Sequence, residues 1–495
     1  DVGEPMLGLE IAWHCIRARR RAEFARYLIS GSDEAIEQGA HVSAERALLT
    51  AIPSLDTGVR EQAQFRLALV LQDQGRWAES EVVLVSIGDS ISDSSTHTKC
   101  EALQAIATVM RRSMTGAPDT EAFEEVFHIV RTHASESIRI RAAAAIASYA
   151  VNTLDPSAAS TTIHLLDQRP LDGSSPLNRA GILLAKAQLM WPARNYDETS
   201  DYLRQDNDLV DNVAARSPLS SRIARGQGVT LAATGHFIEA IPRLQRALDI
   251  AQHIGNDMAA GNCLAGLAMC NQRLGRYDTM LDHTRRALRI DRLTQTPTYY
   301  FACLFYEAFA LTMLTRESEA LESLDRSDRQ CDSFSGTWIH QAWLIWSADV
   351  LRLMGEERRA VRRARLGLEA GGGQLMNLGL AGPCARWYLS IRNDLGTTDS
   401  IDNLFREQVR NIAKRDATDQ AEIGLAALSD EAAAVLNPED IVNARSRIPD
   451  HLPEATWAQL RRLGLQRYVE TFIQWRSSNP TYDAQHSLEP RPLSE

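Results

Sequence analysis

The sequence has little of what membrane, metal and nucleotide sites require. No apolar run approaches the roughly 20 residues that a helix needs to cross a bilayer, and no signal peptide opens the chain. No GxxxxGK[ST] motif is present, so no phosphate-binding loop is expected. The 7 cysteines form no CxxC pair and have no zinc-like spacing with histidine. We therefore expect no cofactor, no metal and no membrane contact, with the cysteines buried as small apolar residues in a reducing, cytoplasmic compartment.

Catalytic residues in recognisable settings are also missing. Ser32 lies in SGSDEA, which lacks the flanking glycines and the strand-to-helix elbow of a hydrolase nucleophile. His128 and His133 are five residues apart, a spacing that does not stack two side chains on one helix face. The sequence therefore predicts that the protein is not an enzyme. An enzyme whose site follows no known motif is the remaining alternative of that class.

Positive charge is not in excess. The chain has 53 Lys and Arg against 64 Asp and Glu, a formal net charge of -11. Phosphate binding depends on clustered cations, so this balance argues against a nucleic-acid-binding surface over the whole chain. Two arginine-rich stretches, at residues 17–26 and 358–365, are interpreted as solvated helix faces. For the first stretch, docking on a domain upstream of Asp1 is an alternative.

What the sequence does have is a repeat. The stretch RGQGVTLAATGHFIEAIPRLQRALDIA, residues 225–251, is followed by similar stretches at intervals of 40 residues. Earlier stretches keep the register less strictly, and the whole series fits about ten helical pairs. The expected turns between paired helices lie at or near Gly39, Gly75, Gly116, Asp155, Arg194, Gly235, Gly275, Thr315, Gly355 and Gly396.

The residue types at recurring positions explain how such pairs pack. Small residues let two antiparallel helices approach closely, and a turn glycine ends the first helix in the left-handed conformation. These small residues are Ala68, Gly228, Ala268, Ala308 and Ala348 on first helices, and Ser80, Ala240, Ala320 and Ala360 on second helices. An aromatic residue two positions after the turn glycine, such as Trp77, Phe237 or Tyr277, fills the space under the turn. Because no pair can bury its apolar face alone, neighbours must stack. The sequence predicts an all-α solenoid of about ten antiparallel hairpins, with no sheet.

This pattern resembles the tetratricopeptide repeat in its longer form of roughly 40 residues. The resemblance is clearest at residues 61–90 and 221–370 and covers about 22–410. It implies a right-handed superhelix whose concave groove binds a protein or a peptide. Known repeats that hold a peptide's terminal carboxylate use Lys and Asn on consecutive first helices. Here the matching positions hold Arg225, Gly226, Ala265 and Met269, so we do not expect a clamp of that kind.

A second resemblance lies at the front of the chain. Residues 7–48, LGLEIAWHCIRARRRAEFARYLISGSDEAIEQGAHVSAERAL, resemble the junction at which STAND signalling ATPases pass into their helical sensor arm. The large ATP-binding LuxR-type regulators belong to this bacterial group. The resemblance implies an NTPase module upstream of Asp1 and a sensing, autoinhibitory role for the repeats. The sequence begins Asp-Val-Gly, so we expect it to be part of a longer chain. No LuxR-type helix-turn-helix is recognisable at the far end, which leaves other STAND types open.

The expected organisation has four parts. Residues 1–21 form a junction helix, residues 22–413 the repeat superhelix, residues 414–476 a short helical cap, and residues 477–495 a disordered tail. The cap is expected because breaks at Asn437-Pro438 and Pro449 to Pro453 divide the stretch after residue 413 into three or four shorter helices, which would cover the exposed apolar end of the solenoid.

The candidate binding residues are aromatic and cationic. The stretches TYYFACLFYEAF (298–309) and TWIHQAWLIWSADV (337–350) hold more rings than one stripe of a helix can bury. Aromatic anchors with a few arginines are typical of a binding hot spot. The groove residues expected from the repeat register are Phe305, Tyr306, Phe309, Trp343, Trp346, Arg225, Arg273 and Arg352. The alternative is that the rings fill the core between repeats.

These observations together favour a binding module. We expect a superhelix that binds a protein or peptide in its groove and acts as the sensing and autoinhibitory arm of a larger signalling NTPase. The alternative is a free-standing scaffold that assembles partner proteins.

Overall fold

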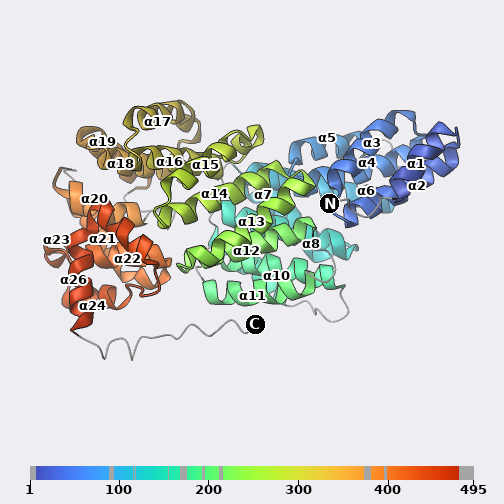
Figure 1. Ribbon diagram of the computed structural model, residues 1–495. Helices are drawn as coiled ribbons and strands as arrows, with labels where there is room; N and C mark the ends of the chain where they lie inside the picture. Colours follow the sequence, from blue (N-terminus) through green and yellow to red (C-terminus); the bar gives the residue numbers. More distant parts are fainter. Residues whose placement is uncertain are drawn as a thin grey trace. The chain divides into compact units, whose positions relative to one another are not determined.

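The computed structural model describes residues 7–88, 94–114, 116, 119–153, 155–167, 175–191, 195–210, 216–372, 381–394 and 398–478 (Figure 1). Within these ranges the chain forms helices and turns and no strand, which confirms the all-α prediction. The chain divides into two compact units. Unit 1 contains Asp1–Gln272 and Tyr277–Ile339, and unit 2 contains Arg273–Arg276 and His340–Glu495.

Unit 1 is a row of helical hairpins preceded by one additional helix, α1 (Leu7–Arg17). The hairpins are α2 (Arg21–Glu37) with α3 (His41–Ala51), α4 (Thr57–Asp73) with α5 (Trp77–Gly88), α6 (Ser94–Ser113) with α7 (Thr120–Thr132), α8 (Glu136–Thr153) with α9 (Pro156–Asp167), α10 (Pro176–Met190) with α11 (Tyr196–Val210), α12 (Pro218–Ala233) with α13 (Phe237–Ile254), α14 (Asp257–Arg273) with α15 (Tyr277–Leu288), and α16 (Pro297–Met313) with α17 (Glu317–Cys331). This arrangement confirms the predicted α-solenoid.

The predicted turns fall between the paired helices. Gly235, Gly275 and Gly355 have φ angles of 92°, 68° and 77°, in the left-handed region that glycine adopts without steric cost. Thr315 occupies the same place in its hairpin with φ of 60°, although it is β-branched. The expected turns at Arg194 and Gly396 lie outside the described residues.

Small residues lie where the paired helices cross, as the sequence predicts. Ser80 is fully buried, and its hydroxyl donates a hydrogen bond to the main-chain oxygen of Ala68 at 3.0 Å. A Cβ added at Gly228 would lie 2.6 Å from Cγ of Leu244 on the paired helix, so only glycine fits there. The aromatic side chains of Phe237 and Tyr277 are buried under their turns.

Helices far apart in the sequence also meet within unit 1. The α4–α5 turn contacts the α13–α14 turn: the Gln74 amide donates to the Ile254 carbonyl at 3.3 Å, and the Asn256 amide donates to the Asp73 carbonyl at 2.8 Å. We call this contact between the two turns the seam. Further along, the Trp338 indole donates to the carbonyl of Asn152 at 2.9 Å. The row of hairpins in unit 1 therefore coils until later hairpins touch earlier ones.

The Asp73 side chain is held beside the seam by two other helices. Its carboxylate lies 2.8 Å from a guanidinium nitrogen of Arg141 on α8 and 3.2 Å from Nε2 of the fully buried His41 on α3. Burial alone would raise the pKa of Asp73, but the Arg141 and His41 side chains hold it well below its usual value. Asp73 is therefore ionised at neutral pH and ties α3, α4 and α8 together.

Unit 2 begins with its longest helices, and most of the helices after residue 413 are shorter. Its helices are α18 (Trp338–Leu353, from His340 onward), α19 (Glu357–Ala370), α20 (Ala381–Ile391), α21 (Thr398–Arg410), α22 (Ala417–Ala426), α23 (Asp430–Ala433), α24 (Pro438–Ser446), α25 (Glu454–Leu460) and α26 (Gln466–Ser477). The shorter helices after residue 413 belong to the same compact unit as α19 to α21. The expected boundary at residue 413 thus falls inside unit 2, and the proposed tail lies outside the described residues apart from Ser477 and Ser478.

The cysteines are buried, as the sequence predicts. Each of Cys15, Cys100, Cys263, Cys270, Cys303, Cys331 and Cys384 is a free thiol inside its unit. None of the helices in the described ranges is both long and apolar enough to pass through a membrane.

Candidate functional site

The aromatic residues singled out in the sequence divide into two groups. Phe305 and Phe309 on α16 are 5% and 0% exposed, and Trp343 on α18 is 0% exposed. These three rings fill the interiors of their units, the alternative that the sequence left open, and they offer no surface to a ligand. Tyr306 of unit 1 and Trp346 of unit 2 are half-buried and keep part of their rings accessible.

The arginines singled out in the sequence also have different surroundings. In unit 2, Arg273 lies 3.1 Å from the buried carboxylate of Glu422, and Arg352 lies 3.3 Å from that of Asp349. In unit 1, the half-buried Arg225 donates a hydrogen bond to the Tyr299 hydroxyl at 3.3 Å. Arg273 and Arg352 are thus neutralised within unit 2, whereas the only hydrogen-bond partner of Arg225 among the described residues is a phenol.

The Arg225–Tyr299 hydrogen bond joins the first helices of two hairpins and passes over the first helix of the hairpin between them. Arg225 lies on α12 and Tyr299 on α16. The hairpin between them in the sequence is α14 with α15, and α14 is its first helix. Packed helices lie about 8–10 Å apart, so in a flat row α12 and α16 would be roughly 16–20 Å apart. An extended arginine and an extended tyrosine can span such a distance when both reach over α14 from the same side, so the two side chains mark one common side of the three helices. We call this side of α12, α14 and α16 the Arg225 face.

Half-buried side chains follow this face along each helix. On α16 Tyr299, Ala302 and Tyr306 are half-buried at spacings of three and four residues, so they form one stripe. The corresponding half-buried side chains are Arg222, Arg225 and Val229 on α12 and Asn262 and Met269 on α14.

Two polar groups on the Arg225 face have informative hydrogen bonding. Arg222 donates to the side-chain oxygen of Gln188 on α10 at 3.1 Å. Asn262 on α14 has a buried side-chain oxygen that accepts no hydrogen bond from any residue the structure describes. A buried acceptor without a donor costs free energy, so this oxygen is suited to accept a hydrogen bond from a ligand.

Unit 2 contains a buried network of ion pairs at its centre. Arg386 on α20 is 4% exposed and lies 2.5 Å from Asp349 and 2.5 Å from Glu422, two carboxylates whose side chains are 0% exposed. Burial acts to raise the pKa of Asp349, but Arg386 and Arg352 hold it below its usual range. A Cβ at Gly382 would lie 2.0 Å from Glu422, so a glycine makes room for the network. These residues pair with one another and serve the fold of unit 2.

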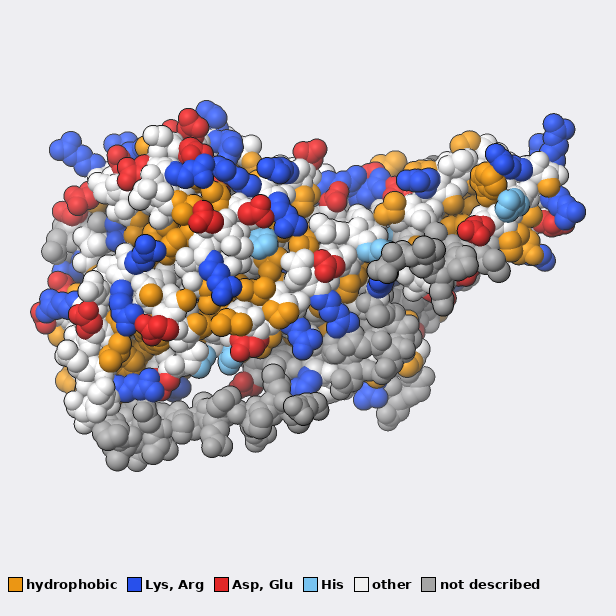
Figure 2. Space-filling model, in the orientation of Figure 1, with side chains coloured by type: hydrophobic (Ala, Val, Ile, Leu, Met, Phe, Trp, Pro, Cys, Tyr) orange, Lys and Arg blue, Asp and Glu red, His pale blue; other side chains and the backbone are white. Residues whose placement is uncertain are grey.

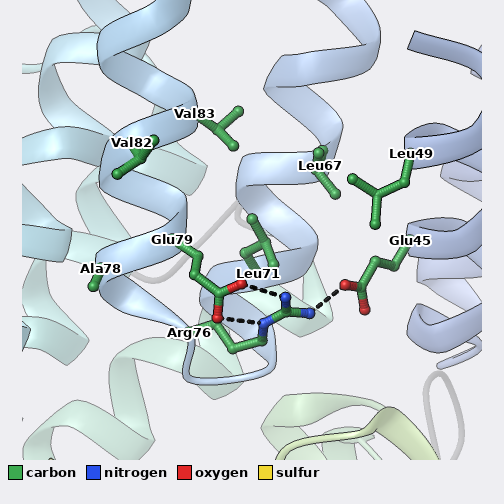
Figure 3. A pocket seen from close by; sticks show the side chains of 9 residues that line it. All are labelled: Glu45, Leu49, Leu67, Leu71, Arg76, Ala78, Glu79, Val82 and Val83. Atoms are coloured by element: carbon green, nitrogen blue, oxygen red, sulfur yellow. Dashed lines mark hydrogen bonds and ion pairs between the residues drawn. The ribbon is translucent and has the colours of Figure 1, made fainter. Parts of the chain in front are cut away.

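A pocket opens between α3, α4 and α5 of unit 1 (Figure 3). Its volume is about 390 Å³, and its apolar walls include Leu49 and Val82, which are 51% and 70% exposed. At one end Arg76 is paired with both Glu45 and Glu79 (Figure 3). The hydrogen bonds from Arg76 hold the pKa of the Glu79 carboxyl below its usual value. Arg292 also pairs with Glu79, at 2.9 Å, so the charges at this pocket are matched within the protein and its other walls are apolar.

The visible surface gives no sign of a nucleic-acid interface. Figure 2 shows Lys and Arg side chains interspersed with Asp and Glu side chains over the described part of the face in view. Of the described residues, no group of three or more His, Cys, Asp or Glu is arranged to hold a metal ion.

Sequence reasoning missed Tyr299 as a partner of Arg225 and missed the Asp73 cluster. Tyr299 lies in the aromatic stretch 298–309, which the sequence analysis singled out. The sequence does not show that the Tyr299 side chain points toward Arg225. Asp73 and Arg141 are 68 residues apart, and no local pattern links them.

Comparisons with known proteins identify the repeat. A family model described as tetratricopeptide repeat matches residues 219–293. No curated protein matches the chain. A Rap protein complexed with competence and sporulation factor is similar in structure, with a TM-score of 0.48, 10% identity, and coverage of 76% of this chain and 99% of that one. Yeast Tom70 has a TM-score of 0.39 and 11% identity, covering 97% of this chain and 99% of its own. The repeat resemblance drawn from the sequence is confirmed, and the STAND resemblance stays a prediction.

Proposed function

We propose that this chain, an α-solenoid with tetratricopeptide repeats at residues 219–293, binds a protein or peptide on the Arg225 face of unit 1. The observation that carries the proposal is the hydrogen bond from Arg225 to Tyr299, because it places side chains of α12 and α16 on one common side of α14, the side expected to line the groove. Concave surfaces of stacked hairpins are where repeat proteins bind extended partners.

The side chains on this face have the mixed character of a binding surface. Tyr306 and Met269 provide partly accessible apolar contact, and Asn262 and Arg225 provide hydrogen-bonding groups. A few polar groups set among apolar ones fix the orientation of a bound chain. The aromatic anchor on α16 would be Tyr306, since Phe305 and Phe309 are buried.

The finer proposal is that binding serves as a signal. In a longer chain with an upstream NTPase, the repeats would hold the resting state until a trigger binds the active arrangement more tightly. Two features support the proposal that another domain precedes these repeats and packs against them. Residues 7–48 resemble the STAND junction, and α1 exposes Trp13 (51%) and Ile16 (45%) beside the arginine-rich stretch. The reading frame upstream of Asp1 tests this: a phosphate-binding loop supports the sensor arm, and an immediate start codon supports the free-standing scaffold.

Binding itself is tested with the purified chain and a randomised ten-residue peptide library. Retained peptides are synthesised, and their dissociation constants are measured for the wild type and for two variants. We expect Tyr306→Ala to weaken binding about tenfold or more, because an aromatic anchor carries a large share of binding free energy. The matched variant Val82→Ala lies at the α3–α5 pocket and should bind as the wild type does.

The opposite pattern of affinities would assign peptide binding to the pocket between α3, α4 and α5. If Val82→Ala weakens binding and Tyr306→Ala leaves it unchanged, with both variants giving the helical circular dichroism of the wild type, the peptide binds between α3 and α5. If the wild type retains no peptide, the proposal of a peptide-binding chain is wrong.

A further inference from the structure

Exposed apolar side chains gather on α1 and the first hairpins of unit 1. Among the residues that the structure describes, 11 large apolar side chains are exposed, and six of them lie between residues 13 and 85: Trp13, Ile16, Val42, Leu49, Val82 and Val85. Single exposed apolar residues are common on soluble proteins, but a concentration of them is typical of a surface that another molecule covers. This part of unit 1 is therefore suited to a protein partner.

One part of this surface is basic. Trp13 and Ile16 are exposed on α1, and the guanidinium carbon of Arg17 lies 3.9 Å from the centre of the Trp13 ring. α1, the turn after it and the beginning of α2 hold five exposed arginines and two exposed glutamates: Arg17, Arg19, Arg20, Arg21, Arg26, Glu10 and Glu23. Arg20 pairs with Glu23 at 3.2 Å, whereas Arg17, Arg19 and Arg21 form no ion pair with a described residue. We call Trp13, Ile16, Arg17, Arg19 and Arg21 the basic face.

The other parts of the surface are apolar and acidic, and they lie on second helices of the first hairpins. Leu49 on α3 and Val82 on α5 line the pocket between α3, α4 and α5 (Figure 3). On α7, the second helix of the following hairpin, Glu121, Glu124 and Glu125 are exposed, and none of the three forms an ion pair with a described residue. Unit 1 therefore carries, besides the basic face, an apolar pocket that is followed along the row by an acidic helix.

The spacing of groups on the basic face fits that of the pocket and the acidic helix. An α-helix rises about 1.5 Å per residue, so Arg17 lies roughly 6 Å beyond Trp13 along α1, and Arg19 and Arg21 follow it. Packed helices lie about 8–10 Å apart, a distance that a further turn of helix and an extended arginine side chain together cover. A Trp13 ring placed in the pocket can therefore have arginines within reach of the glutamates on α7.

We propose that the basic face of one copy of this chain docks on the first hairpins of a second copy. Trp13 enters the pocket between α3, α4 and α5, and Arg17 and Arg21 lie beside Glu124 and Glu125 of α7. The contact is reciprocal, so each copy covers both surfaces of the other and a dimer results. Charge complementarity selects this occupant, because the acidic helix is the surface of opposite charge that the chain itself supplies. The inference goes beyond peptide binding on the Arg225 face and does not depend on it.

The first test measures the mass of the purified chain by sedimentation equilibrium over a range of concentrations. We expect a dimer that dissociates on dilution and in high salt, because salt screens contacts between exposed charges. Arg17→Glu combined with Arg21→Glu should raise the dimer dissociation constant by about 100-fold or more, because it places like charges opposite each other. The matched control is Arg358→Glu with Arg362→Glu, which makes the same charge change at two exposed arginines of α19 and should leave the dimer unchanged.

The second test exchanges the charges between the two surfaces. Glu124→Arg combined with Glu125→Arg should also prevent the chain from pairing with itself, because α7 then repels the basic face. Mixed in equal amounts with the Arg17→Glu, Arg21→Glu variant, it should form a heterodimer with a dissociation constant within about tenfold of the wild-type value, because each contact again joins opposite charges. Circular dichroism shows whether each variant keeps the helical content of the wild type.

Three results would overturn the inference. A single-chain mass of the wild type at every concentration would exclude the dimer and leave the exposed side of α1 to a preceding domain. A dimer that survives the reversal of Arg17 and Arg21 would place the interface elsewhere. Folded variants that stay monomeric when mixed would exclude α7 as the surface that receives the basic face. Each of these results leaves the proposal of peptide binding on the Arg225 face unaffected.

Discussion

Two arginines, one in each unit, differ in how far their positive charge is compensated by neighbouring carboxylates. In unit 2, Arg386 is 4% exposed and contacts two buried carboxylates, Asp349 and Glu422. In unit 1, Arg225 is half-buried, and its only hydrogen-bond partner among the described residues is the Tyr299 hydroxyl. A charge that serves the fold is compensated within the fold, and one that is left uncompensated is suited to a partner. The Asp73 cluster of unit 1 belongs with Arg386, because its charges are matched.

The largest expected effect comes from breaking the unit 2 network. Glu422→Gln should lower the free energy of unfolding by about 3–5 kcal/mol, because Arg386 and Arg273 lose a buried carboxylate. Guanidinium unfolding followed by tryptophan fluorescence measures the loss, since Trp387 is fully buried in the same unit. The control is Glu454→Gln, whose carboxylate is 78% exposed beside Arg461 and should cost less than about 1 kcal/mol. Equal losses would remove the distinction between buried and exposed pairs.

A smaller effect with a pH signature is expected at Asp73. Asp73→Asn should cost about 2 kcal/mol at pH 7, because it removes the charge that faces Arg141 and His41. The folded-state pKa of Asp73 is lowered, so the stability it contributes is complete above the unfolded value of 3.8 and is lost as the pH falls below it. Urea midpoints of wild type and variant should therefore converge between pH 4 and strongly acidic pH. A constant difference across that range would contradict the pairing. Asp33→Asn, at a pair whose carboxylate is 48% exposed, is the control.

The smallest expected effect separates the two hydrogen bonds of Asn256. Its side-chain oxygen caps α14 by accepting from the Ala259 N–H at 2.8 Å, and its amide nitrogen donates to the Asp73 carbonyl across the seam. Asn256→Ser keeps a capping oxygen and loses the seam bond, which should cost about 1 kcal/mol. Asn256→Ala loses both bonds and should cost about 1 kcal/mol more. Urea unfolding of the two variants provides the comparison. If the serine variant matches the wild type, the seam contributes nothing to stability.

The repeats could be predicted from the sequence because their signal is local. The glycine of a turn, the aromatic after it and the small residue at the crossing lie within one hairpin, and each has a steric reason that holds whatever the rest of the chain does. This is why the left-handed turns at Gly235, Gly275 and Gly355 fall where the 40-residue interval places them. Even Thr315 keeps the register, although its side chain does not favour that conformation.

The candidate site was only partly predictable from the sequence. It depends on the rotation of each helix about its own axis and on the rotation of each hairpin relative to the one before it. Phe305 and Tyr306 are adjacent, and a turn of 100° about the helix axis decides which ring is buried. The partner of Arg225 is 74 residues away, and the partners of the α4–α5 turn are about 180 residues away. Contacts at such separations depend on the pitch of the coil, which no single repeat encodes.

The seam also sets the number of hairpins. A stack whose units touch only their neighbours can gain or lose one without penalty elsewhere, which is how repeat families change length. In unit 1 the turn that holds Gln74 and Gly75 meets the turn that holds Ile254 and Asn256. Deleting one hairpin between them would bring an unrelated turn opposite Gly75. We therefore expect the number of hairpins between these two turns to be constrained.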